Sequence, residues 1–180
     1  MTRLPLYILA SMPLIALGMK KRSSLDAFGL FAYTEGIGGQ PLFYANGYAY
    51  IGDANQSNST DAATVTFSPG PNDTWIASPN TTLSNSTTPS WSNVTLTLPG
   101  PAASDKRVGF TSTGNSSDGD VASGFIFYGA TAMHVTDDGL ESMFYALRIS
   151  DQVSALYWND TSMGQVPVVL RSMAPSNPPN

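Results

Sequence analysis

One histidine and a short acidic segment are the residues of this chain best suited to catalysis. His134 is the only histidine among 180 residues, and there is no cysteine. A catalytic triad needs a nucleophile, a base and an orienting acid, and the Gly-x-Ser-x-Gly pattern of serine hydrolases does not occur. A zinc site needs three or four nitrogen, sulfur or oxygen ligands. We therefore predict a surface histidine at a strand end, no metal and no other cofactor.

The acidic segment "HVTDDGLES" offers Asp137, Asp138 and Glu141. Paired carboxylates hydrolyse glycosides, one as the acid and the other as nucleophile or base, so a glycoside hydrolase or lyase is one hypothesis. Asp138-Gly139 is also a hairpin signal, which favours a turn. The oxygen-rich segment "DANQSNSTD" (53–61) resembles a calcium loop, but it lacks the glycine and the final glutamate of an EF-hand.

The segment "PLFYANGYAYIGD" contains four aromatic residues around Asn46-Gly47. Asn-Gly between apolar runs is the strongest local hairpin signal. With every second side chain on the same face, both faces of this hairpin are largely apolar, which predicts a central hairpin covered on both sides. The alternative is a sugar-stacking groove lined by Tyr48 and Tyr50. The predicted cross-strand pairs are Ala45–Tyr48 and Phe43–Tyr50 on one face, and Tyr44–Ala49 and Leu42–Ile51 on the other.

The three tryptophans are the other aromatic residues that could stack on a sugar. We predict core burial for Trp75, Trp91 and Trp158. Trp91 follows "TTPS" at a loop-to-strand junction and is predicted to be the most exposed of the three. The glycan-binding hypothesis therefore depends on Trp91, Tyr48 and Tyr50.

Residues 1–18 read as a secretory signal peptide. The apolar run from Leu4 to Leu17 is shorter than the roughly 20 residues that span a bilayer, so no membrane span is expected after signal removal. Residues 19–22 end in "KKR", which is either a dibasic processing site or an ordinary charged flank. Residues 23–176 are predicted to form one domain, and residues 177–180 a disordered tail.

The charge pattern excludes nucleic acid as a partner. The formal net charge is −5, from 8 basic and 13 acidic residues. Cleavage after Arg22 would remove four basic residues and leave four against 13, a net charge of −9. Nucleic-acid binding needs clustered positive charge. A polysaccharide or a host or cell-surface protein is the expected partner.

Eight Asn-x-Ser/Thr sequons support export, because N-glycosylation occurs in the secretory pathway. Charged residues make up only 12% of the chain, about half the usual share, and glycans would add solubility. The sequons are Asn55, Asn58, Asn72, Asn80, Asn85, Asn93, Asn115 and Asn159.

Short apolar runs alternate with Gly, Pro, Asn, Asp and Ser clusters, which predicts a single all-β domain, an antiparallel β-sandwich or a barrel-like fold. In "SNVTLTLPG", Thr95 and Thr97 are predicted to share a polar, solvent-facing surface with Asn93. "TEGIGGQP" is predicted to be a flexible connection. The predicted strands are 28–33, 42–45, 48–52, 64–68, 74–77, 93–98, 107–113, 124–128, 132–135, 143–149, 153–158 and 166–171.

The runs "LFAYTEGIGGQPLFYANGYAYIGDA", "PSWSNVTLTLP", "GFIFYG", "ESMFYAL" and "LYWN…VPVVLRSMAPS" resemble a group of small, cysteine-free secreted proteins of filamentous fungi. The resemblance covers roughly residues 24–176. It implies a fungal, secreted protein and carries no activity, ligand or site residue. The first functional hypothesis is thus a secreted fungal glycoprotein without catalytic activity, acting at the cell wall or in host or environment interaction. Glycan binding and carboxylate-based hydrolysis are the alternatives.

Overall fold

A computed structural model describes residues 26–80, 82, 89–112 and 119–176. Its strands all pair antiparallel, which confirms the predicted all-β fold. The described helical segments are two 3-10 turns, η1 (Ala54–Gln56) and η2 (Pro71–Asp73). Within the described residues, no helix has the length and apolar composition needed to cross a bilayer. The predicted signal peptide, dibasic segment and C-terminal tail, and the sequons Asn85 and Asn115, lie outside the described residues.

The strands are β1 (Phe31–Thr34), β2 (Ile37–Ala45), β3 (Tyr48–Gly52), β4 (Ala63–Pro69), β5 (Trp75–Pro79), β6 (Val94–Thr97), β7 (Gly109–Ser112), β8 (Phe125–Tyr128), β9 (Thr131–Thr136), β10 (Gly139–Glu141), β11 (Phe144–Arg148), β12 (Val153–Trp158), β13 (Val166–Pro167) and β14 (Val169–Arg171).

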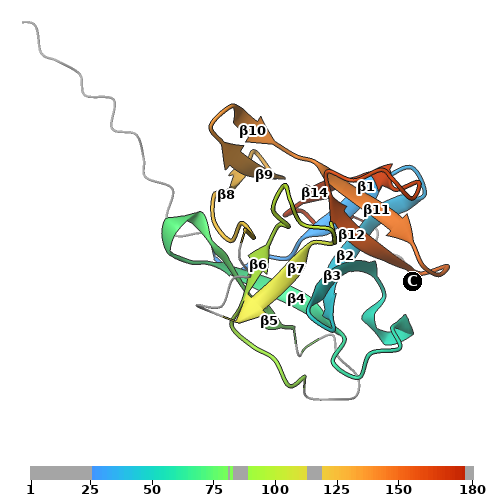
Figure 1. Cartoon of the computed structure of the whole chain (residues 1–180). Helices are drawn as coiled ribbons and strands as arrows, with labels where there is room; N and C mark the ends of the chain where they lie inside the picture. The colour runs from blue at the N-terminus through green and yellow to red at the C-terminus, as the bar shows by residue number, and fades with distance from the viewer. Residues whose placement is uncertain (1–25, 81, 83–88, 113–118, 177–180) are drawn as a thin grey trace, which may run out of the picture.

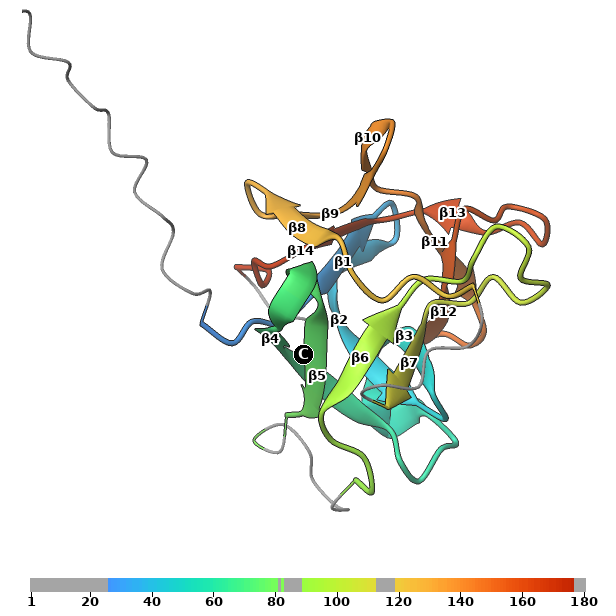
Figure 2. The same cartoon turned by 60° about the vertical axis from the view of Figure 1, so that its left-hand side comes forward.

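Six of these strands close into a barrel. Hydrogen bonding runs in the order β2-β4-β5-β6-β7-β3, and β3 pairs back with β2 to complete the ring. A barrel of six strands is too narrow to hold a channel, so side chains fill its interior. In Figures 1 and 2, β4 to β7 lie below the β8–β10 segment.

The long strand β2 connects the barrel to a second group of strands. Its second half pairs with β3 and β4 in the barrel, whereas its first half pairs with β1. β1 then pairs with β14, β14 meets β9 at one position, and β9 lies between β8 on one side and β10 on the other. From β3 the sheet also continues through β12 and β11 to β13. One continuous hydrogen-bonded path therefore links the described strands, and β8 branches from it at β9.

The Asn46-Gly47 hairpin forms with the predicted register. The observed pairs are Leu42–Ile51, Phe43–Tyr50, Tyr44–Ala49 and Ala45–Tyr48. Both turn residues have positive φ, 51° at Asn46 and 84° at Gly47, which is the conformation that a two-residue hairpin turn with the right twist requires.

Both faces of this hairpin contribute to apolar clusters, as predicted. Leu42, Ala49 and Ile51 are fully buried in the main core. Phe43, Ala45 and Val153 form a second cluster, here called the outer cluster, against which Tyr50, Ala54 and Ala62 also pack. The 54–62 segment contacts the turn through Ser59, whose Oγ donates to Asn46 Oδ1 at 2.9 Å.

Two predictions of strands and loops were wrong. The segment predicted as a flexible connection turns at Glu35-Gly36 and continues as the first half of β2, with Gly36 at a φ of 76°. The predicted strand 166–171 is divided into β13 and β14. Val168, between them, is buried, and its N–H donates to Phe144 O at 2.9 Å. At Val168 the chain passes from β13, which pairs with β11, to β14, which pairs with β1.

The predicted solvent-facing surface of β6 was also wrong. Thr95 and Thr97 are buried, whereas Asn93, just before the strand, is exposed. The alternation itself is correct, since Val94 and Leu96 belong to the main core. Alternation along β6 predicts which side chains share a face. It does not predict that the segment 99–105 lies beside the outward face at Thr97.

Candidate functional site

The structure buries all three tryptophans, as predicted, but it contradicts the predicted exposure of Trp91. Trp91 is 7% exposed, and Trp158, at 9%, is the most exposed of the three. The Trp91 ring stacks on Tyr44 with centroids 4.2 Å apart, and its Nε1–H donates to the Asp61 carbonyl at 2.8 Å. A buried indole with its N–H satisfied is a packing residue, so Trp91 cannot present a face to a sugar.

The candidate catalytic carboxylates lie on the β9–β10 hairpin. Asp137 and Asp138 are exposed at the turn between β9 and β10, where Thr136 pairs with Gly139. Glu141 lies on β10 opposite His134. The hairpin predicted at Asp138-Gly139 is therefore present, with Asp137 and Asp138 as its turn residues. None of the three acids lines either of the two hollows described below.

His134 is a half-buried residue of β9 between two aromatic rings. Its ring centroid lies 5.8 Å from that of Phe125 and 5.9 Å from that of Trp158. The Nδ1 atom is buried and has no hydrogen-bond partner among the described residues. Burial lowers the pKa of His134, although a hydrogen bond to the Ser123 backbone and the charge of Glu141 oppose that shift. The imidazole is therefore held neutral at neutral pH, as a packed residue and not the surface histidine predicted.

Stability is expected to depend on pH through His134. Because its folded pKa lies below the ordinary value of 6.5, the unfolded chain binds this proton more readily. Stability is therefore full above about pH 6.5 and falls as the pH drops toward the folded pKa, in a range where ordinary carboxylates are still ionised. Urea unfolding at about pH 8 and about pH 5 checks this. The loss should be smaller in His134→Gln, and an equal loss in both proteins would contradict it.

A polar hollow lies on the outside of the barrel and is here called the barrel cleft. Its volume is about 500 Å³. The floor comes from neighbouring positions on β3, β6 and β7, because Tyr48 pairs with Gly109 and Gly109 pairs with Thr97. One wall is the segment 99–105. The lining residues are Asn46, Gly47, Tyr48, Thr97, Pro99, Ala103, Ser104, Asp105, Arg107, Gly109, Phe110, Thr111 and Asp120.

Hydrogen bonds to backbone groups hold the segments that form the walls of the barrel cleft. The ammonium group of Lys106 donates to the carbonyls of Gly100 at 3.0 Å and Pro101 at 2.8 Å, which holds the 99–105 segment. Leu98 and Val121 exchange both backbone hydrogen bonds, and this places Asp120 at the rim. The cleft is thus formed before any ligand binds, which lowers the cost of binding.

Arg107 is the central side chain of the barrel cleft. Its guanidinium carbon lies 3.6 Å from the centroid of the Tyr48 ring. The same guanidinium makes a forked pair with Asp105, with Nη2 2.6 Å from Oδ2 and Nε 3.1 Å from each carboxylate oxygen. Arg107 N–H also donates to Asp105 Oδ1 at 3.0 Å. A carboxylate and an aromatic ring hold this planar guanidinium in place. Its side chain therefore loses little conformational entropy when a ligand binds.

The ion pair keeps both partners charged. Hydrogen bonds from the Arg107 side chain are the main cause that lowers the pKa of Asp105 below its usual value. Asp105 in turn raises the pKa of Arg107. Asp105 therefore accepts hydrogen bonds at neutral pH and is unsuited to donate a proton. This favours a role in ligand binding over one in general acid catalysis.

The predicted tyrosines lie at and beside the barrel cleft. Tyr48 lines it, but one face of its ring is covered by Arg107. Tyr50 is half-buried and stacks on Phe43 in the outer cluster, with centroids 5.5 Å apart. Sequence reasoning named Tyr48 and missed Arg107, Asp105 and Thr97. The signal that could have found Arg107 is the scarcity of basic residues after position 22.

The described sequon asparagines are accessible. Asn55, Asn58, Asn72, Asn93 and Asn159 are exposed, and Asn80 is half-buried. Asn72, Asn93 and Asn159 have positive φ, a conformation that asparagine tolerates in turns. None of these six asparagines lines the barrel cleft.

No family model, no curated protein and no solved structure matches this chain. What the barrel cleft can bind therefore has to follow from its own chemistry.

Proposed function

We propose that this protein is a secreted fungal glycoprotein that binds carbohydrate in the barrel cleft, at the cell wall or on the surface of a host. The residue types of the cleft support this ligand class. Hydroxyls of Ser104 and Thr111, the carboxylates of Asp105 and Asp120, and an arginine offer donors and acceptors around a partly apolar floor. Polyhydroxylated rings need this mixture of hydrogen-bonding groups and apolar contact.

The single observation that carries the proposal is the Tyr48–Arg107–Asp105 stack. It places an aromatic ring, a guanidinium and a carboxylate together in one preformed hollow. Hydrogen bonds to charged groups are stronger than those between neutral groups. A sugar hydroxyl beside Asp105 and Arg107 can donate to the carboxylate and accept from the guanidinium. The stack therefore suits a neutral, hydroxyl-rich ligand.

The test is retention of the glycosylated protein on insoluble chitin, glucan, mannan, cellulose and xylan. We expect retention on one of these polymers, and at least about tenfold weaker binding by Arg107→Ala, equivalent to ~1.4 kcal/mol. Arg148→Ala is the matched control, because Arg148 also pairs with a nearby aspartate, Asp151, at 3.0 Å. Arg148 does not line the barrel cleft, so this control should bind like the unchanged protein.

A second variant guards against a folding defect. Asp120→Asn changes one rim group of the barrel cleft and leaves the Arg107–Asp105 pair intact. Retention should fall in Asp120→Asn as well, with an unchanged thermal unfolding midpoint. Equal retention of wild type, Arg107→Ala and Asp120→Asn, or retention on none of the polymers, would contradict the proposal.

A further inference from the structure

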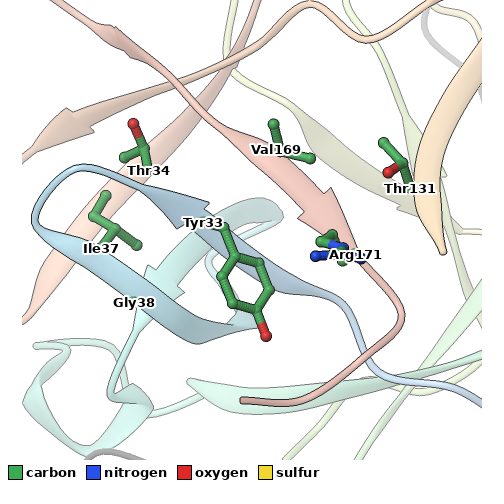
Figure 3. A pocket seen from close by; sticks show the side chains of 7 residues that line it. All are labelled: Tyr33, Thr34, Ile37, Gly38, Thr131, Val169 and Arg171. Atoms are coloured by element: carbon green, nitrogen blue, oxygen red, sulfur yellow. The ribbon is translucent and has the colours of Figure 1, made fainter. Parts of the chain in front are cut away.

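A second hollow lies on the β1–β14 sheet, away from the barrel cleft, and is here called the sheet hollow. Figure 3 shows it between the β1–β2 hairpin and the strands β14 and β9. Its volume is about 500 Å³, and Tyr33, Ile37, Thr131, Val169 and Arg171 line it. None of these residues lines the barrel cleft.

Strand register brings the side chains of Tyr33, Val169 and Arg171 to one surface of the sheet. Tyr33 pairs with Val169, and Arg171 is two positions further along β14, so all three point to the same side of the sheet. Arg171 also pairs with Thr131 of β9. Because Ala32 and Leu170, which alternate with them, are fully buried, the surface with Tyr33 and Arg171 faces outward.

Arg171 is a guanidinium without a carboxylate partner in the described part of the chain. The ion pairs there are Arg107–Asp105 and Arg148–Asp151, and Lys106 is bound by two carbonyls. The guanidinium carbon of Arg171 lies 5.8 Å from the centroid of the Tyr33 ring. The five N–H donors of Arg171 are therefore open to a ligand.

The aromatic wall of the sheet hollow is fixed in place. The Tyr33 hydroxyl donates to the Met173 carbonyl at 2.8 Å, which anchors the ring. Val169, the partner of Tyr33 across the strands, adds apolar surface, and Thr131 contributes a hydroxyl group to the lining. No sequon occurs in β1, β2, β9 or β14, so the strands that form the hollow carry no glycan of their own.

We propose that the sheet hollow binds a carboxylate carried on a ring. The guanidinium fork of Arg171 matches a carboxylate in two parallel hydrogen bonds. The ring of the ligand would lie against Tyr33 and Val169, and Thr131 would bond a hydroxyl. Two sources supply this chemistry, a uronic acid within an acidic polysaccharide and a free aromatic acid. The proposal is independent of carbohydrate binding in the barrel cleft.

The test titrates the glycosylated protein with oligogalacturonate, with its methyl ester and with benzoate, by calorimetry. The acid should bind at least about tenfold more tightly than the ester, ~1.4 kcal/mol. Benzoate that binds as well as oligogalacturonate indicates a general ring-carboxylate site, and binding of oligogalacturonate alone indicates a uronate site. Equal binding of acid and ester, or binding of neither acid, overturns the proposal.

Four variants locate the binding. Arg171→Gln should lose about tenfold in affinity, and Arg171→Lys should lose less, because a lysine keeps the charge without the fork. Arg148→Gln is the control for an exposed arginine and should bind normally. Arg107→Ala should keep the preference for the acid over the ester, because that preference arises at Arg171, which does not line the barrel cleft. Normal binding by Arg171→Gln would refute the assignment.

Discussion

Replacing Phe67 by alanine is expected to destabilise the protein by ~3–5 kcal/mol, the usual cost of removing a large buried aromatic side chain. Phe67 is fully buried on β4. Its ring contacts those of Phe28, Trp75 and Phe110, with centroids 5.6, 6.1 and 6.3 Å apart. Phe67 and Phe28 also exchange two backbone hydrogen bonds. Ring stacking and these bonds together hold Phe28 against the barrel strand β4.

Urea unfolding measures this effect, and Tyr128→Ala is its control. Tyr128 is 73% exposed at the end of β8, so its removal should change the free energy of unfolding by less than ~0.5 kcal/mol. Phe67→Leu should fall between the two variants, because it leaves a smaller cavity. A loss in Phe67→Ala no larger than that in Tyr128→Ala would show that the ring is not part of a tightly packed core.

The second large effect is expected at Gly52, the last residue of β3. Its φ is 124°, and a Cβ built there would lie 1.9 Å from the carbonyl oxygen of Gln152. That oxygen cannot easily move, because it accepts from Asp53 N–H at 3.2 Å. Gly52→Ala should therefore cost more than ~2 kcal/mol, combining backbone strain with a backbone clash.

Two other glycines separate the causes of this effect. Gly47 has a φ of 84° but open space around a Cβ, so Gly47→Ala measures the cost of positive φ by itself. Gly38 has neither a positive φ nor a neighbour within 4 Å, and Gly38→Ala should be close to neutral. We expect the loss of stability to rise from Gly38 to Gly47 to Gly52. Equal unfolding midpoints for the three variants would contradict the clash.

The hairpin at Asn46-Gly47 could be predicted from the sequence because all of its determinants are local. Two turn residues that tolerate positive φ lie between two runs with clear alternation, and the register follows from the turn length. β3 and β12 were predicted with their observed bounds, 48–52 and 153–158, since both are apolar runs rich in Tyr, Ile, Val and Trp that are followed by turn-forming sequences.

The failures share a different physical origin. The burial of Trp91 depends on Tyr44 and Asp61, which are distant in the sequence. The covered outer surface of β6 depends on the segment 99–105. Three glycines among four residues suggested a flexible connection, but pairing with β1 makes that segment the start of β2. The Trp91 contacts are nonlocal, whereas the other two are made by segments adjacent in the sequence. In those two cases the chain folds back without a turn signal as clear as Asn-Gly, so the apolar pattern does not report the contact.

The candidate site was predicted only in part for the same reason. Tyr48 was named because it belongs to an aromatic hairpin. The barrel cleft joins β3, β6 and β7 with the 99–105 segment and Asp120, and this neighbourhood exists only in the closed barrel. Asp105 and Arg107 are two positions apart, a spacing common to many exposed loops. Their significance comes from the Tyr48 ring beneath the guanidinium.

The most direct measurement of the central claim is the position of a bound sugar on the folded protein. A soluble oligosaccharide of the polymer that retains the protein is titrated into isotope-labelled protein, and the backbone amide shifts are followed by NMR. The account predicts that the largest shifts fall on Tyr48, Arg107 and Gly109, around the barrel cleft, and that Arg107→Ala needs at least about tenfold more sugar to reach the same shifts at Tyr48 and Gly109. Shifts centred on other strands, with Tyr48 and Gly109 unmoved, would contradict it.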